Sequence, residues 1–238
     1  MLSELPPAII FDMDDTIIAD SEMSERCWEE VCATFAPRLG DAPGETLLET
    51  IREIRRGNLA RREQLERGGS DLRGVRQNLL SSAFHVLGIA DNALVQEMTD
   101  SYMNLKSILV QPYPGSKDTL RRLKQNGIRL AMITNGPVTE QQAKIDRADL
   151  GHFFESIVIE GEFGVGKPDS RVFRHTLEQL QVSPEQTWVV GDNLVNDVGG
   201  AQAVGIYGVW VDWRGTGLPG NSTVIPDRII NSVVELVN

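Results

Sequence analysis

The stretch Ala8-Ile9-Ile10-Phe11-Asp12-Met13-Asp14-Asp15-Thr16 decides the fold class of this chain of 238 residues. Its first four residues are apolar without alternation, as expected for a strand that helices cover on both faces of a parallel sheet. The acidic residues come directly after that strand. Because ligands of open α/β sheets bind beyond the carboxyl ends of the strands, the residues that follow each buried strand are the first candidates for a functional site.

Four further apolar runs predict buried strands, at 128–133, 156–159, 188–190 and 207–211. Helical patterns alternate with them, at 140–149, 170–181 and 194–204. The last of these ends before Gly205, a residue suited to the left-handed turn that closes a helix. Alternating strands and helices predict an α/β fold with a doubly wound, mainly parallel, Rossmann-like sheet.

The interval between the first two predicted strands is too long for one crossover. A βαβ unit needs about 30 residues or slightly more, whereas residues 16–127 separate these strands and contain no convincing strand. Helices are expected near 22–35, 45–66, 72–87 and 92–108, followed by a crossover helix at 116–126. Pro112-Tyr113-Pro114-Gly115 is typical of a turn at the return to the sheet. We therefore expect an all-helical domain at 20–110, inserted into an α/β core at 1–19 and 111–238.

Composition argues against several classes of protein. The chain has 34 acidic and 23 basic residues, a net charge of −11, and so has no bulk attraction for nucleic acid or anionic lipid. No apolar run approaches the roughly 20 residues of a membrane helix, and the first residues lack the order of a signal peptide. Cys27 and Cys32, with no second pair, favour neither a disulfide framework nor a zinc site. We expect a cytoplasmic protein without nucleic-acid or membrane partners.

Polar side chains follow four of the predicted strands. In chain order they are Asp12, Asp14, Thr134, Asn135, Lys167, Asp192 and Asp197. A single aspartate at a strand end is more often a turn or helix-capping residue. Four strand ends of this kind are hard to assign to capping, so we expect one shared site at this edge of the sheet.

The charges of these residues indicate the ligand. Carboxylates brought close together repel by about 4 kcal/mol per pair at an effective dielectric constant near 20, and a phosphate dianion would add to the repulsion. Lys167 alone cannot balance such a site, whereas Lys167 with a divalent cation nearly can. Oxygen ligands favour Mg²⁺, which commonly bridges carboxylate and phosphate. A calcium-binding EF-hand is disfavoured, because 12–16 lacks the glycine and the distal glutamate of that loop.

These residues resemble the motifs of the haloacid dehalogenase superfamily of aspartyl-phosphate phosphohydrolases. All four family motifs occur in order: Asp12-Met13-Asp14-Asp15-Thr16, Ile133-Thr134-Asn135-Gly136, Lys167-Pro168, and Gly191-Asp192 with Asp197. The resemblance covers essentially the whole chain, including a helical domain where the family has its first (C1) type of cap. Asp15 departs from the pattern, in which Gly or Asn is commoner before the threonine.

The resemblance implies a role for each motif residue in catalysis. Asp12 would be the nucleophile, and Asp14 would be the general acid and then the general base. Thr134 and the backbone of Asn135 would bind the phosphoryl group, and Lys167 would neutralise charge on the phosphate and the nucleophile.

The resemblance also implies a magnesium site. Asp12, the backbone carbonyl of Asp14 and Asp192 would hold Mg²⁺. Asp197 would orient Lys167 or a metal-bound water.

Asp14 separates two chemistries within this family. Members that cleave carbon–halogen bonds typically lack an acid there, because halide leaves without a proton. We therefore expect a Mg²⁺-dependent phosphatase, a monomer or homodimer, that acts on a small soluble phosphomonoester: a sugar phosphate, a nucleoside monophosphate or a phosphoglycolate-like acid. A phosphomutase stays open as the alternative, followed by a 2-haloacid dehalogenase or a non-catalytic small-molecule binder.

Two glycine-rich segments imitate nucleotide-binding motifs. Residues 161–167 have phosphate-loop spacing, but Pro168 follows in place of the required Ser or Thr. Residues 215–220 match the dinucleotide fingerprint, but Pro219 lies within them and no helix pattern follows. We interpret neither segment as a nucleotide site.

The inserted region carries many arginines and aromatic residues. Its arginines lie at positions 52, 55, 56, 61, 62, 67, 73 and 76. Arg and Glu at helical spacing predict a solvated, salt-bridged face, although one arginine could contact an anionic substrate. Core packing is expected for Trp28, Phe35, Phe84 and Tyr102, whereas Trp210 and Trp213 could border the site or pack in the core.

Overall fold

The computed structural model describes residues 5–40, 44–65 and 72–237. The chain divides into two compact units, one made of Met1–Ala19 with Gln111–Asn238 and the other of Asp20–Val110. We call the first the α/β unit and the second the helical unit. None of the helices in the described ranges is long and apolar enough to cross a membrane.

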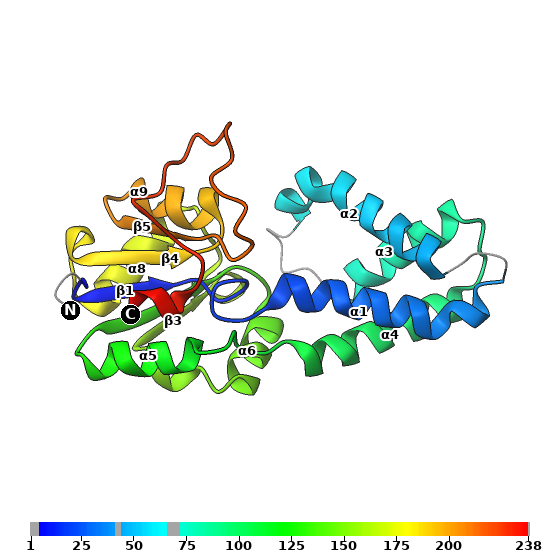
Figure 1. The fold of residues 1–238 in the computed structure, drawn as a ribbon, viewed down its shortest axis with the longest axis horizontal. Helices are drawn as coiled ribbons and strands as arrows, with labels where there is room; N and C mark the ends of the chain where they lie inside the picture. The colour runs from blue at the N-terminus through cyan, green and yellow to red at the C-terminus, as the bar shows by residue number, and fades with distance from the viewer. Residues whose placement is uncertain (1–4, 41–43, 66–71, 238) are drawn as a thin grey trace. The chain divides into compact units, whose positions relative to one another are not determined.

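The α/β unit is built on a six-stranded sheet in the order β3-β2-β1-β4-β5-β6, in which every neighbouring pair of strands is parallel (Figure 1). The strands are β1 (Ala8–Phe11), β2 (Arg129–Thr134), β3 (Ser156–Ile159), β4 (Thr187–Gly191), β5 (Tyr207–Val211) and β6 (Arg228–Ile230). Strand β1 lies between β2 and β4, so the strand order reverses beside it. The carboxyl ends of these three strands are therefore neighbours, which is where open sheets bind ligands.

Helices cover the sheet because its strands are apolar on both faces. The helices of this unit are α5 (Ser116–Gln125), α6 (Val138–Arg147), α7 (Glu160–Phe163), α8 (Ser170–Leu180) and α9 (Gly200–Gln202). Ile10 of β1 and Ile133 of β2 lie in one core cluster with Phe173 of α8 and Ala201 of α9. Because successive residues of a strand point to opposite faces of the sheet, both faces of these apolar strands need cover. Helix α5 also packs against β2, and its Leu123 is buried. The predicted doubly wound α/β fold is confirmed.

The shorter segments connect these elements. They are the 3₁₀ turns η3 (Gly151–Phe153), η4 (Pro184–Gln186) and η6 (Val233–Leu236), and the π-helix η5 (Leu194–Gly199). The single helix predicted over 194–204 is thus wrong in detail, because its first part is the π-helix and only three residues follow as α9. Strand β6 was not predicted, since three residues at the sheet edge carry too little apolar pattern.

The helical unit consists of α1 (Asp20–Phe35), α2 (Gly44–Leu65), α3 (Leu72–Val86) and α4 (Asn92–Leu109), with the short 3₁₀ turn η1 (Ala36–Arg38). Trp28 of α1 stacks on Tyr102 of α4, with ring centroids 4.0 Å apart. Both rings and Phe84 of α3 are fully buried, and Phe35 packs against the same cluster. The prediction that these aromatic residues form a core is confirmed.

Described arginines of the helical unit pair with acids. Arg52 lies 2.6 Å from Glu25 and 3.1 Å from Glu29, and Arg55 lies 3.0 Å from Glu25. Arg73 pairs with Asp100 at 2.6 Å. The predicted salt-bridged face is confirmed for these side chains.

Two other described arginines have partners as well, since Arg56 pairs with Glu49 and the Arg76 guanidinium lies 5.9 Å from the centre of the Tyr102 ring. The side chains at 61, 62 and 67 lie outside the described residues.

Replacing Trp28 by alanine should lower the free energy of unfolding by about 3–5 kcal/mol, because a large buried ring and its stacking contact with Tyr102 are lost. Urea denaturation followed by circular dichroism measures this change. The matched control is Val86→Ala on α3, where the side chain is 66% exposed; it should change stability by no more than about 0.5 kcal/mol. Equal losses in both variants would contradict the packing described.

Candidate active site

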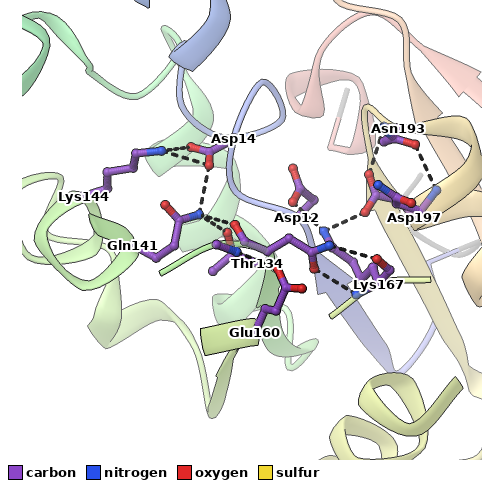
Figure 2. Close-up of polar contacts among 12 residues, drawn as sticks. Asp12, Asp14, Thr134, Gln141, Lys144, Glu160, Lys167, Asn193 and Asp197 are labelled. Atoms are coloured by element: carbon purple, nitrogen blue, oxygen red, sulfur yellow. Dashed lines mark hydrogen bonds and ion pairs between the residues drawn. The ribbon is translucent and has the colours of Figure 1, made fainter. Parts of the chain in front are cut away.

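Asp12 lies at the centre of a buried charge cluster at the carboxyl end of β1. Its backbone N–H donates to Val190 O at 2.9 Å, which fixes the end of β1 against β4. Lys167 Nζ lies 2.5 Å from Asp12 Oδ1 and 2.6 Å from Asp197 Oδ1 (Figure 2). The structure therefore brings together three side chains that the sequence places far apart.

Burial and like charges shift the titration of this cluster. Burial raises the pKa of Asp12, Lys167 opposes the rise and neighbouring carboxylates add to it, giving a value of about 7. Burial and the charges of Asp12 and Asp197 raise the pKa of Asp192 to about 9. Burial alone would lower the pKa of Lys167, but the two carboxylates that contact it hold the pKa above its usual range. Three carboxyl groups thus face one ammonium group, and an added cation would stabilise their ionised forms.

The donor set at this cluster fits a divalent cation. Asp12, Asp192 and Asp197 each offer a carboxylate oxygen, and these oxygens lie within 4.8 Å of one another. Asp12 Oδ2 is buried and has no hydrogen-bond partner among the described residues. Carboxylate oxygens are the ligands that Mg²⁺ prefers, and an unpartnered buried carboxylate oxygen is costly unless a ligand satisfies it. The residues present therefore suit Mg²⁺.

Asp197 is held in place from two sides. Its Oδ1 faces Lys167, and its Oδ2 accepts a hydrogen bond from the Asn193 backbone N–H at 2.9 Å. Asn193 in turn caps the π-helix η5, with Oδ1 accepting from the N–H of Val195 and Asn196. Asp197 is therefore placed to orient Lys167, and its carboxylate also belongs to the group of three that could hold a cation.

A second group of contacts surrounds Asp14. Lys144 Nζ lies 2.9 and 3.0 Å from the two Asp14 oxygens, and Gln141 Nε2 lies 2.9 Å from Asp14 Oδ2. The same Gln141 nitrogen lies 2.5 Å from Thr134 Oγ1 and 3.0 Å from the carbonyl oxygen of Asn135. Sequence reasoning missed Gln141 and Lys144. The available signal was their three-residue spacing on the helix directly after β2, which puts both on one helix face.

The Asn135 side chain contacts the backbone of Lys167. Its Nδ2 donates to Lys167 O and its Oδ1 accepts from Lys167 N–H, both at 2.8 Å. A Cβ on Gly166 would lie 2.6 Å from Asn135 Oδ1, so only glycine allows this close approach. Glu160 supports the segment after β2 that contains Asn135, because its Oε2 accepts a hydrogen bond from the Gly136 N–H at 3.0 Å. Asn135 thus fixes the segment that carries Lys167.

Two further residues border the cluster. Asp15 is buried and has φ of +58°, the left-handed region in which Gly, Asn and Asp are the usual residues. This conformation explains why Asp can stand where the family more often has Gly or Asn. Trp210 is buried and its Nε1 donates to the carbonyl of Asp192 at 2.7 Å, whereas Trp213 is half-buried beside Tyr113.

Comparison with known proteins identifies the family of this chain. A family model of haloacid dehalogenase-like hydrolases matches residues 6–205. The chain belongs to this family. The match spans the strand ends that carry Asp12, Thr134, Lys167 and Asp192.

Individual relatives narrow the chemistry of this hydrolase. A glyceraldehyde 3-phosphate phosphatase of Pyrococcus furiosus is 31% identical over 212 residues, 85% of this chain and 79% of that protein. A phosphoserine phosphatase of Thermus thermophilus is 40% identical over 124 residues, 52% of this chain and 49% of that protein. The solved structure of Bacillus subtilis YfnB, described as a HAD-hydrolase bound to magnesium, is 25% identical, with a TM-score of 0.74 over 98% of this chain and 97% of that chain. The prediction of a phosphatase of this family is confirmed.

Replacing Gly191 by alanine should disrupt the charge cluster of this hydrolase. A Cβ at that position would overlap the Asp197 carboxylate, and a forced shift of this kind costs about 1–3 kcal/mol. We expect a lower melting temperature and at least a tenfold loss of aryl phosphatase activity, since a small misplacement of catalytic groups has large effects. The control is Gly220→Ala, where a Cβ meets no atom of the described residues within 4 Å. Wild-type activity in the Gly191 variant would contradict the geometry.

Proposed function

We propose that this hydrolase is a Mg²⁺-dependent phosphatase that cleaves a small soluble phosphomonoester through an aspartyl-phosphate on Asp12. The observation that carries the proposal is the buried Asp12 carboxylate, paired with Lys167 at 2.5 Å and grouped with two further aspartates. Asp14, which is not one of those three aspartates, lies two residues after Asp12 and supplies the carboxyl group that we propose for proton transfer.

The first half of the reaction forms the covalent intermediate. An Asp12 carboxylate oxygen attacks phosphorus, and the bond from phosphorus to the ester oxygen breaks. Asp14, acting as general acid, gives its proton to the departing oxygen, so that an alcohol leaves. Lys167 offsets the negative charge on Asp12 and on the transferring phosphoryl group. Thr134 and the Asn135 backbone hold that group at the end of β2.

The second half returns the enzyme to its starting state. Asp14, now ionised, takes a proton from water as the water oxygen attacks phosphorus. The bond from phosphorus to the Asp12 oxygen breaks, which releases inorganic phosphate and restores the carboxylate. The Asp14 proton is then ready for the next cycle.

Asp12, Asp192 and the backbone carbonyl of Asp14 are the groups that would hold Mg²⁺. When bound, the cation supplies positive charge that lets a phosphate dianion enter a site rich in carboxylates. Asp12 has a free buried oxygen for this purpose, and Asp197 keeps Lys167 in position beside it.

The substrate proposed is a small phosphorylated metabolite. The two phosphatase relatives are named for glyceraldehyde 3-phosphate and phosphoserine, which are different small phosphate esters. We propose for the helical unit, which is inserted between β1 and β2 at Asp20–Val110, the role of a C1-type cap. A cytoplasmic location fits such a substrate. Assays of inorganic phosphate release against a panel of phosphorylated metabolites test this part of the proposal.

Replacing Asp12 by asparagine should lower kcat for an aryl phosphate by more than about 10³-fold, because the nucleophile is lost. Phosphate release measured with purified full-length protein tests this expectation. The control is Asp149→Asn, an exposed aspartate outside the site. Circular dichroism should show that both variants are folded. Activity near wild type in Asp12→Asn would remove the nucleophile from the mechanism.

Chelation with EDTA should abolish phosphatase activity, and added Mg²⁺ should restore it. Binding should also appear without turnover, since a ligand at about 100 times its dissociation constant stabilises the folded state by about 2.7 kcal/mol. A thermal shift with Mg²⁺ therefore provides a second measurement, and Asp192→Asn should reduce that shift. Full activity in the chelator, or an equal shift in the variant, would refute the proposed metal site.

A further inference from the structure

We propose that Gln141 and Lys144 are positioning residues that hold the Asp14 carboxylate against the end of β2. The inference rests on the proposed function, which assigns proton transfer to Asp14. Both residues lie on α6, outside the four sequence motifs, and neither has a part in the reaction as derived above. Figure 2 shows the Asp14 carboxylate directed toward these two side chains.

Two buried side chains fix the orientation of the partly exposed Asp14 carboxylate. Its side chain is 30% exposed, whereas that of Lys144 is 7% exposed. Lys144 contacts both carboxylate oxygens, and Gln141 contacts one of them. A partly exposed aspartate in a loop can change rotamer freely, so contacts from two buried donors select one orientation.

Gln141 couples that orientation to the phosphate-binding end of β2. The residue is 1% exposed, and its Nε2 lies within hydrogen-bonding distance of Asp14, Thr134 and the Asn135 carbonyl. One amide group thus sets the distance between the proposed proton donor and the proposed phosphoryl-binding hydroxyl. A shift of either partner would break a buried hydrogen bond, which the surrounding structure resists.

The local fold explains why α6 supplies both contacts. The helix starts at Val138, four residues after β2 ends at Thr134. Residues three apart on a helix share a face, so Gln141 and Lys144 face the strand end together, while Gln142 between them is exposed. Within the part of the chain that the structure describes, the Gln142 side chain hydrogen-bonds to Asp146 of the same helix, at 2.8 Å. The chain therefore contains its own control residue.

A purely structural role would be the simpler explanation of these contacts. Lys144 also lies 3.5 Å from Glu140, and a buried ammonium group needs negative partners in any fold. The two explanations differ in what they predict for the leaving group. Misplacing a general acid slows the departure of a poor leaving group and spares a good one, whereas general damage to the site slows both.

The test compares phenyl phosphate, a poor leaving group, with dinitrophenyl phosphate, whose phenolate leaves without a proton. The full chain is assayed with Mg²⁺, and kcat/KM reports the steps up to cleavage of the ester bond. Lys144→Met and Gln141→Met should each lose about 10- to 100-fold in kcat/KM on phenyl phosphate, part of the ~10²–10⁴ that a placed acid supplies. On dinitrophenyl phosphate the loss should be less than about threefold. Lys144→Arg, which keeps the donor, should recover most of the activity.

Gln142→Met is the matched control and should leave both rates unchanged. Two substituted positions keep the test decisive should the buried Gln141 variant not fold. Asp14→Asn separates the two levels of the proposal. If Asp14→Asn loses activity selectively on phenyl phosphate but the α6 variants do not, the positioning role is overturned while the proposed function stands. If Asp14→Asn slows both substrates equally, the acid role itself fails.

Discussion

The ammonium group of Lys167, held between the carboxylates of Asp12 and Asp197, is the interaction on which the rest of the site depends. The three groups come from the end of β1, the loop before α8 and the π-helix η5. All three are buried, and removing the Lys167 ammonium group would leave the two carboxylates without a partner charge in a medium of low polarity, which is strongly destabilising. The fold must therefore bring these segments to the same place before the site can exist.

Glycines let those segments approach. Gly191 gives Asp197 the space that a Cβ would occupy, and Gly166 does the same for Asn135. Gly200 stands against the Phe173 ring of α8, where a Cβ would lie 2.7 Å from a ring carbon. The absence of three side chains thus matters as much as the presence of the charged ones, because each allows a close approach between segments distant in sequence.

Sequence patterns predicted the parts of this protein that follow from strand geometry. The strands Ala8–Phe11, Ser156–Ile159 and Tyr207–Val211 have the predicted bounds, because uninterrupted apolar runs specify strands buried on both faces. Parallel strands end at one edge, so the meeting of Asp12 with Lys167 and Asp197 also followed. The contacts of Gln141 and Lys144 did not follow. Polar residues on a helix are usually solvated, and only the packing of α6 against the end of β2 shows that this face is buried.

Local conformations were harder to predict for a related reason. Leu194–Gly199 carries an ordinary helical pattern, but its π-helical geometry depends on the Asn193 cap and on the place of Asp197 beside Lys167. Strand β6 forms by pairing with the edge of β5, because its own three residues carry too little apolar pattern to specify a strand. Tertiary contacts determine the conformation of both segments, and these contacts cannot be predicted from the local pattern of a single sequence.

The central position of β1 also constrains how the chain is made. Ile10 lies beside Ala131 of β2 and Val189 of β4, so this strand leaves the ribosome before partners that are synthesised more than a hundred residues later. Contacts so distant in sequence are slow to form, and unpaired apolar strands invite association in the meantime. Strand β1 is consequently translated before both of its neighbours but completed late, and the order of synthesis delays a working site until the segment that carries Asp197 has been made.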